Sequence, residues 1–125
     1  MSKTIRRLPD GELEVMQAVW RCAPPVSRTD LEKVLQARHP LAATTILTLL
    51  SRLVEKGFLT AEKQGRSNCY TPLVSEQDYL AAQSRRFVDA LCGGKMSVFA
   101  AALCDSGLSK EDLAELRDLL EKGGL

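Results

Sequence analysis

The chain has 125 residues, an apolar content of 45% and a formal net charge of +1. This length accommodates one medium domain, or a small domain with an appendage. Aromatic residues make up only 5% of the chain, while leucine and alanine are abundant, which favours a mainly helical fold with few strands. No run approaches the roughly 18 apolar residues of a membrane span, and residues 1–7 have no signal-peptide pattern, so we expect a cytoplasmic protein.

Cut near Val74, the chain divides into two parts of opposite charge. Residues 1–74 carry eleven Lys and Arg against seven Asp and Glu, a net charge of +4, whereas residues 75–125 carry six against nine, a net charge of −3. A basic part can face an anionic polymer, and an acidic part is less suited to one. The division therefore favours a nucleic acid as partner of the first part and disfavours a membrane surface.

The residues that usually carry enzyme chemistry are scattered. Cys22, Cys69, Cys92 and Cys104 lie far apart and form no C-x-x-C pair, a spacing that indicates neither a zinc site nor a disulfide framework. His39 is the single histidine, and no Cys-His or Ser-His-Asp arrangement or glycine-rich phosphate loop accompanies it. We therefore expect no enzyme activity, no metal and no cofactor.

Two amphipathic helices are predicted in the first 40 residues. The first begins at Asp10, the expected N-cap, and ends around Cys22, because two prolines follow and cannot continue it. The second begins at Ser27, which matches a capping box with Asp30, and ends near Pro40. Apolar residues recur at helical spacing in both segments, so each helix is expected to bury one side.

The segment from Ala42 to Lys56 is the most informative part of the sequence. It is predicted to be a helix that Gly57 ends in the left-handed conformation. At about 100° per residue, its large aliphatic side chains gather on one face. The opposite face is a row of short hydroxyl side chains with one arginine, where Thr44, Thr48, Ser51 and Glu55 lie, flanked by Thr45 and Arg52. A solvated helix face normally favours Glu, Lys and Gln over threonine, so these exposed threonines indicate a further role.

A β-hairpin is predicted directly after this helix. Two strand-like runs at 58–63 and 67–71 are separated by Gln64-Gly65-Arg66, and Pro72 closes the second run. The order helix, helix, helix, hairpin is the plan of a winged helix-turn-helix. We therefore predict a mainly α fold with a small β-hairpin, in which residues 1–74 form a winged-helix DNA-binding domain.

Residues 75–125 are predicted to form a helical dimerisation region. Three short amphipathic helices are expected, at 76 to about 91, at 95 to about 104, and from Ser109, capped with Asp112, to Gly123-Gly124. Such helices cannot easily bury their apolar faces alone, so we expect them to pack against a second copy. The residues assigned to this interface are Leu80, Phe87, Leu91, Phe99, Leu103, Leu113, Leu116 and Leu120.

The winged-helix plan assigns the polar face of the third helix to the DNA major groove. Hydroxyl and methyl groups there can contact bases and phosphates, and a basic hairpin tip can contact the sugar-phosphate backbone. The assigned residues are Thr44, Thr45, Thr48, Arg52, Lys63 and Arg66, with Gln64, Arg6 and Arg7 as further candidates.

With these elements in place, the chain resembles the penicillinase repressor family, the BlaI- and MecI-like regulators with the copper-responsive CopY branch. The segments that carry the resemblance are Leu13-Glu14-Val15-Met16 with Trp20, Thr45-Ile46, Leu49 to Gly57, Gly65-Arg66, Tyr70-Thr71-Pro72 and Leu108 to Leu116. The C-terminal cysteine cluster of the copper branch is absent, which places the chain closer to BlaI and MecI. The resemblance implies a homodimeric transcriptional repressor on an operator with two-fold symmetry.

The resemblance also implies how such a repressor is released. In the antibiotic-responsive branch a membrane sensor protease cleaves the repressor in its dimerisation region, which untethers the two half-sites. The bond that corresponds to the family's Asn-Phe cleavage site is Val98-Phe99 here. Leu47 stands where the family often has a polar side chain, which suggests a shifted sequence preference or a contact with a thymine methyl group. The inducing signal itself is not identified; antibiotic or cell-envelope stress is one candidate.

Two alternative functions use the same scaffold. One is a winged-helix interaction module that binds no DNA and assembles with a protein partner through its C-terminal helices. The other is a thiol-responsive regulator with Cys92 or Cys104 as the reactive group. The threonine face, the basic hairpin tip and the charge division favour the DNA-binding repressor.

Overall fold

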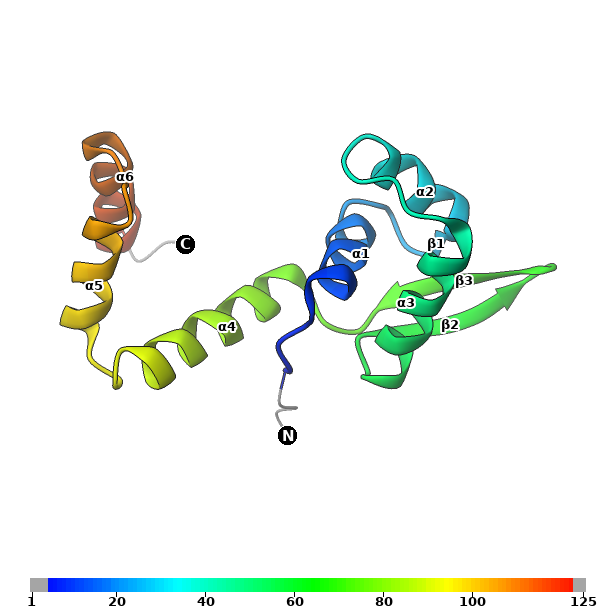
Figure 1. The fold of residues 1–125 in the computed structure, drawn as a ribbon, viewed down its shortest axis with the longest axis horizontal. Coiled ribbons are helices and arrows are strands. Elements are labelled where there is room, and N and C mark those ends of the chain that lie inside the picture. The colour runs from blue at the N-terminus through cyan, green and yellow to red at the C-terminus, as the bar shows by residue number, and fades with distance from the viewer. Residues whose placement is uncertain (1–4, 123–125) are drawn as a thin grey trace. The chain divides into compact units, whose positions relative to one another are not determined.

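The computed structural model describes residues 5–122. Its elements, shown in Figure 1, are α1 (Asp10–Trp20), β1 (Val26–Ser27), α2 (Arg28–Gln36), α3 (Ala43–Glu55), β2 (Leu59–Gln64), β3 (Ser67–Pro72), α4 (Glu76–Leu91), α5 (Met96–Asp105) and α6 (Lys110–Glu121). Two compact units divide between Ala82 and Gln83. The mainly helical fold with a small sheet, predicted from the sequence, is confirmed.

The sheet of the first unit has three antiparallel strands in the order β1-β3-β2. Strands β2 and β3 form the predicted hairpin, and β3 ends at Pro72 as expected. The short strand β1 was not predicted, because two residues are too few to show the alternation that identifies a strand. It adds Val26 to the core beside Tyr70, its partner in β3.

The core of the first unit fills the space between α1, α2, α3 and the base of the hairpin. Its largest fully buried side chains include Met16 of α1, Leu31 of α2, Leu50 of α3 and Phe58. Along each of the three helices the buried side chains recur at helical spacing, so each helix turns one buried face toward the core. The residues on the face of α3 opposite this core are exposed.

The helix ends show which capping predictions hold. The capping box of α2 is confirmed: the Asp30 N–H donates to Ser27 Oγ at 3.1 Å, and the Ser27 N–H donates to Asp30 Oδ2 at 3.1 Å. That backbone hydrogen bond lowers the pKa of Asp30. The predicted N-cap at Asp10 is wrong by one residue, since Pro9 is the N-cap and its carbonyl accepts from the Leu13 N–H. Asp10 instead stabilises the first turn by its charge.

The predicted end of the second helix near Pro40 is also too late. Helix α2 ends at Gln36, and the His39 N–H donates to the Leu35 carbonyl at 2.7 Å to close the last turn. A residue that precedes proline disfavours the helical conformation, so the chain leaves the helix before Pro40. The resulting segment 37–42 is the turn that leads into α3.

Tyr79 ties the start of α4 to the winged-helix unit. Its hydroxyl accepts a hydrogen bond from the Leu8 N–H at 2.9 Å, and its ring lies 5.8 Å from that of Trp20 and 5.9 Å from that of Phe58. The Trp20 indole N–H donates to the Val74 carbonyl at 2.9 Å. The first turn of α4 therefore packs in the first unit, and the compact unit extends past the domain boundary predicted after Val74.

Replacing Tyr79 with phenylalanine is expected to lower the free energy of unfolding by about 1–2 kcal/mol, because the buried Leu8 N–H loses its acceptor. Urea unfolding followed by the fluorescence of Trp20, the single tryptophan, measures this change. Tyr70→Phe is the control, since the Tyr70 ring is buried but its hydroxyl makes no hydrogen bond within residues 5–122. Equal losses in both variants would contradict the assignment.

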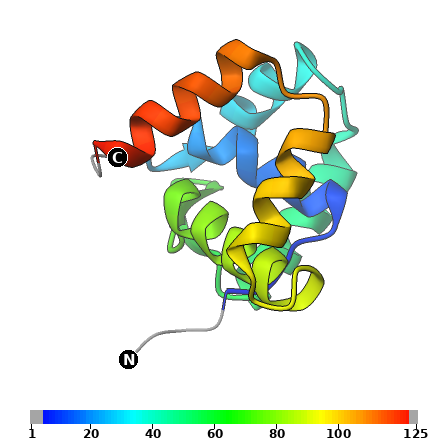
Figure 2. The same cartoon turned by 90° about the vertical axis from the view of Figure 1, so that its left-hand side faces the viewer.

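The second unit contains the rest of α4 together with α5 and α6. The chain bends by 102° between α4 and α5, where Gly93 and Gly94 adopt positive φ. The rings of Phe87 and Phe99 meet edge to face across this bend, 5.8 Å apart. Figure 2 shows α5 and α6 as consecutive helices that are inclined to one another.

Helix α6 begins with the second predicted capping box. The Asp112 N–H donates to Ser109 Oγ at 3.0 Å, and the Ser109 N–H donates to Asp112 Oδ2 at 3.2 Å. The predicted helix end at Gly123-Gly124 lies outside the described residues. No single helix in residues 5–122 is long and apolar enough to cross a membrane; α4 and α5 pass that test only as a pair joined across their bend.

Candidate nucleic-acid interface

The outer face of α3 carries the polar side chains that the sequence assigned to DNA. Ile46, Leu50 and Leu53 are fully buried on the core side. Thr44, Thr45, Leu47, Thr48, Ser51 and Arg52 are all exposed on the other side. The predicted division of this helix into a leucine face and a hydroxyl face is therefore correct. A contact between these residues and DNA stays a prediction.

Thr48 has a fixed hydrogen-bonding role within α3. Its Oγ1 donates to the Thr44 carbonyl at 3.0 Å, and a threonine hydroxyl has only one hydrogen to donate. The oxygen lone pairs and the methyl group remain for an external partner. Thr48 can therefore accept a hydrogen bond from a base amino group, or pack against a thymine methyl group, but cannot donate without breaking its bond to Thr44.

Two interactions hold the C-terminal end of α3 in place. After the last turn Gly57 has φ +82°, and the Phe58 N–H donates to the Leu53 carbonyl at 2.9 Å, which directs Phe58 into the core. Beside it the ammonium group of Lys56 lies 2.5 Å from the Glu12 carboxylate of α1, whose side chain is only 4% exposed. This ion pair fixes α3 against α1.

The turn that enters α3 is held by a hydrogen bond to α1. His39 Nδ1 lies 2.7 Å from Glu14 Oε2. Neither this contact nor the one between Glu12 and Lys56 was predicted from the sequence. Each pair joins residues more than 20 positions apart, so no spacing rule for a single helix could have found them.

The tip of the hairpin presents the expected basic residues. Gln64 pairs with Ser67, so the loop contains only Gly65 and Arg66, and Gly65 at φ +66° supplies the first position of a tight hairpin turn. Lys63 and Arg66 are exposed and form no ion pair within the described part of the chain. The β2–β3 hairpin extends beyond α3 in Figure 1, and a DNA contact at its tip stays a prediction.

The N-terminal segment offers two further exposed cations. Arg6 and Arg7 are exposed, and the backbone just after them is anchored by the hydrogen bond from Leu8 to Tyr79. The structure attaches residues 5–8 to the core, because Leu8 is buried.

Most large apolar side chains of the second unit are open to solvent. Within residues 83–122 only Val88 and Cys92 are buried hydrophobic residues. Among the predicted interface residues, Leu80, Phe87, Leu91 and Leu120 are exposed, and Phe99, Leu103, Leu113 and Leu116 are half-buried. The sequence did not assign three other large apolar residues to this surface, although the structure leaves them exposed: Met96, Val98 and Leu119.

The structure shows where the candidate cleavage bond and the candidate thiols lie. The Val98-Phe99 bond lies inside α5, so a protease would have to open this helix to reach the backbone. Cys104 is exposed and Cys92 is buried, while burial raises the pKa of the Cys22 thiol and lowers its reactivity. Cleavage and thiol regulation both stay predictions.

The chain matches the model of a known protein family over most of its length. The model of the Penicillinase repressor family matches residues 8–122. The chain belongs to the penicillinase repressor family. The match extends from the start of α1 to the end of α6 and so includes both units. The resemblance to the BlaI and MecI branch, identified from the sequence, is confirmed.

Relatives within the family match this chain over nearly its whole length. It is 34% identical to the penicillinase repressor of Bacillus licheniformis over 121 residues, covering 96% of this chain and 94% of that protein. It is 38% identical to an uncharacterized 16.5 kDa protein of Latilactobacillus sakei, covering 96% and 82%. The methicillin resistance regulatory protein MecI of Mammaliicoccus sciuri is 28% identical, with 98% and 99% covered.

Two solved structures are similar to the winged-helix part. The DNA-binding domain of the repressor BlaI superposes with a TM-score of 0.52 at 37% sequence identity, covering 63% of this chain and 94% of that domain. The monomeric form of Bacillus licheniformis BlaI in complex with the blaP half-operator superposes with a TM-score of 0.50, with the same identity and coverage. The winged helix predicted for the first part of the chain is confirmed as a fold.

Proposed function

We propose that the protein represses transcription as a homodimer, with one winged helix on each half of an operator that has two-fold symmetry. DNA binding and repression are properties of the penicillinase repressor family, to which the chain belongs. The observation that carries the assignment of the site is the exposed face of α3, where threonines and Arg52 lie opposite a fully buried leucine face. A helix of this kind fits the major groove.

Each part of the interface has its own task in this proposal. Thr44, Thr48 and Leu47 meet base edges, and the methyl groups of Leu47 and Thr48 suit thymine. Arg52 and the hairpin tip at Lys63 and Arg66 bind phosphates, which fixes the register without reading the sequence. The known complex of a BlaI monomer with a half-operator supports one winged helix for each half-site.

Binding of the purified protein to genomic fragments, with footprinting of the bound ones, tests the function. Thr48→Val keeps the shape of the side chain but removes the oxygen acceptor, so discrimination at one base pair should fall by about 1–3 kcal/mol. Arg66→Ala should weaken operator and random DNA alike and reduce the salt slope by about one. Absence of any footprint, or equal loss on both DNAs for Thr48→Val, would contradict the proposal.

The proposal also includes a proteolytic step that releases the repressor from its operator. A membrane sensor protease would cut at Val98-Phe99 and remove most of α5 and all of α6, so that each winged helix would then bind its half-site alone. The support for it is family membership. Purified protein cut at this bond is expected to retain half-site binding and to lose tight binding to the full operator.

A further inference from the structure

A groove between α1 and the end of α2 lies outside the proposed DNA-binding residues. It has a volume of about 230 Å³ and is lined by side chains from both helices. Its floor is apolar, formed by Ala18 and Leu35, which are buried, and by Val34, which is half-buried. With a water-sized group taking roughly 30 Å³, the groove has room for a ligand of about eight heavy atoms.

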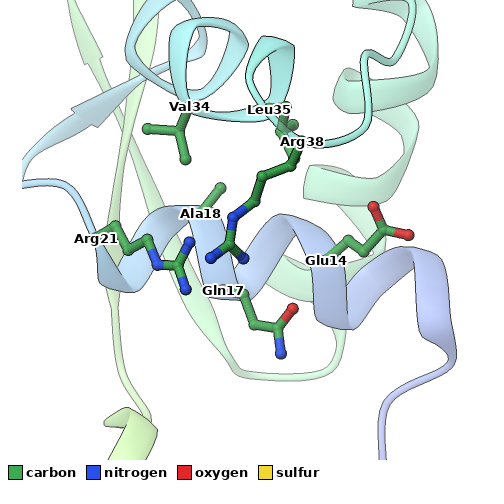
Figure 3. Close-up of a pocket in the computed structure, with 7 residues that line it drawn as sticks. All are labelled: Glu14, Gln17, Ala18, Arg21, Val34, Leu35 and Arg38. Carbon is green, nitrogen blue, oxygen red and sulfur yellow. The ribbon is translucent and has the colours of Figure 1, made fainter.

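Two arginines stand over this apolar floor. Figure 3 shows Arg21 on α1, and Arg38 reaching back over α1 from the segment after α2. Both are exposed, and neither forms an ion pair with any residue of the described range 5–122. Two unpaired guanidinium groups beside one groove repel each other, so an anion that contacts both stabilises the pair. Their planar forks match a carboxylate.

The one carboxylate of the groove determines at which end of the groove an anion binds. Glu14 lines the other end of the groove and is already paired with His39, at 2.7 Å. Its charge disfavours an anion at that end and leaves the arginine end for the negative group. Gln17, one turn of α1 before Arg21, adds an amide that donates or accepts hydrogen bonds.

We propose that this groove binds a small aliphatic carboxylate. The carboxylate lies against Arg21 and Arg38, and the branched or straight alkyl part covers Ala18 and Leu35. An apolar floor beneath two cations is complementary to a ligand with both a negative group and an alkyl group, and inorganic anions lack the alkyl group. Because Arg38 immediately precedes His39, the ligand contacts the segment that leads into α3.

The test uses the full-length protein and 3-methylbutanoate as probe, with 3-methylbutan-1-ol as the neutral match. NMR titration at constant ionic strength should give saturable shifts at Gln17, Arg21 and Val34 with the carboxylate and none with the alcohol. Arg38→Gln should weaken binding about tenfold, because it removes a charge-assisted hydrogen bond. Arg28→Gln, which changes an exposed arginine of α2 outside the groove, should leave the affinity within about twofold.

Three results would contradict the proposal that a carboxylate binds in this groove. They are shifts that never saturate, equal binding of the alcohol, and equal loss of affinity in the Arg38 and Arg28 variants. Amide spectra of each variant show whether the fold is retained before binding is compared. DNA does not enter the titration, so its outcome is independent of the proposed repressor function.

Discussion

Lys56→Met is expected to lower the free energy of unfolding by about 3 kcal/mol. The substitution leaves the Glu12 carboxylate buried without its partner, since the Glu12 side chain is 4% exposed and Lys56 supplies its one hydrogen bond within the described residues. Removing one member of a buried ion pair costs more than removing both, because the remaining charge keeps its desolvation penalty. Denaturant unfolding followed by Trp20 fluorescence measures the loss in the first unit.

A double variant separates the ion pair from packing. Glu12→Met combined with Lys56→Met removes both charges and keeps side chains of similar length. Its stability is expected to return to within about 1 kcal/mol of the original protein, as found for apolar replacement of buried ion pairs. Lys63→Met, an exposed lysine of the hairpin, is the matched control and should change stability by less than about 0.5 kcal/mol. Similar losses in all three variants would refute a special role for this pair.

The same ion pair has a consequence for recognition. Lys56 is the C-cap of α3, and Glu12 lies in the first turns of α1, so their contact fixes the direction in which the polar face of α3 points. Any protein that presents base contacts on a helix needs such support, because small displacements of the helix misplace every side chain on it. The double variant should therefore fold well but bind operator DNA less selectively than the original protein.

Local patterns were enough to predict most elements of the chain. The apolar spacing of α3 separated Ile46 and Leu50 from Thr44 and Thr48 correctly, because the period of a helix determines its buried face. Both capping boxes and the left-handed Gly57 were also predicted. These features depend on residues within four positions of one another, which is the range that sequence patterns describe.

Long-range contacts could not be predicted in this way. The segment from 76 to about 91 was assigned as a whole to the C-terminal dimerisation region, whereas the Tyr79 ring packs with Trp20 and Phe58 of the first unit. Periodicity shows that a helix face is apolar but does not identify its partner. For the same reason the sequence predicted that apolar residues of α5 and α6, such as Phe99 and Leu120, meet a partner but could not identify their contacts, and the interface stays a prediction.

Disrupting the proposed dimer should have the largest effect on DNA binding. Leu91 and Leu120 are 72% and 61% exposed, so glutamates at both positions should cost the single chain little. In a dimer that covers them, two buried charges without partners would oppose association. The double variant Leu91→Glu/Leu120→Glu is therefore expected to sediment as a monomer.

The monomeric variant should lose affinity for the operator because the two winged helices are no longer tethered to one another. In a dimer the second winged helix binds at a high effective concentration once the first is bound, and affinity for a full operator rises by about 10²–10⁴ over a half-site. The monomeric variant should lose this factor on the full operator and keep its affinity for half-operator DNA. Leu73→Glu, at a leucine of the first unit that is 52% exposed, is the matched control and should remain dimeric. A monomeric double variant that still binds the full operator as tightly as the original protein would show that the C-terminal helices do not couple the half-sites.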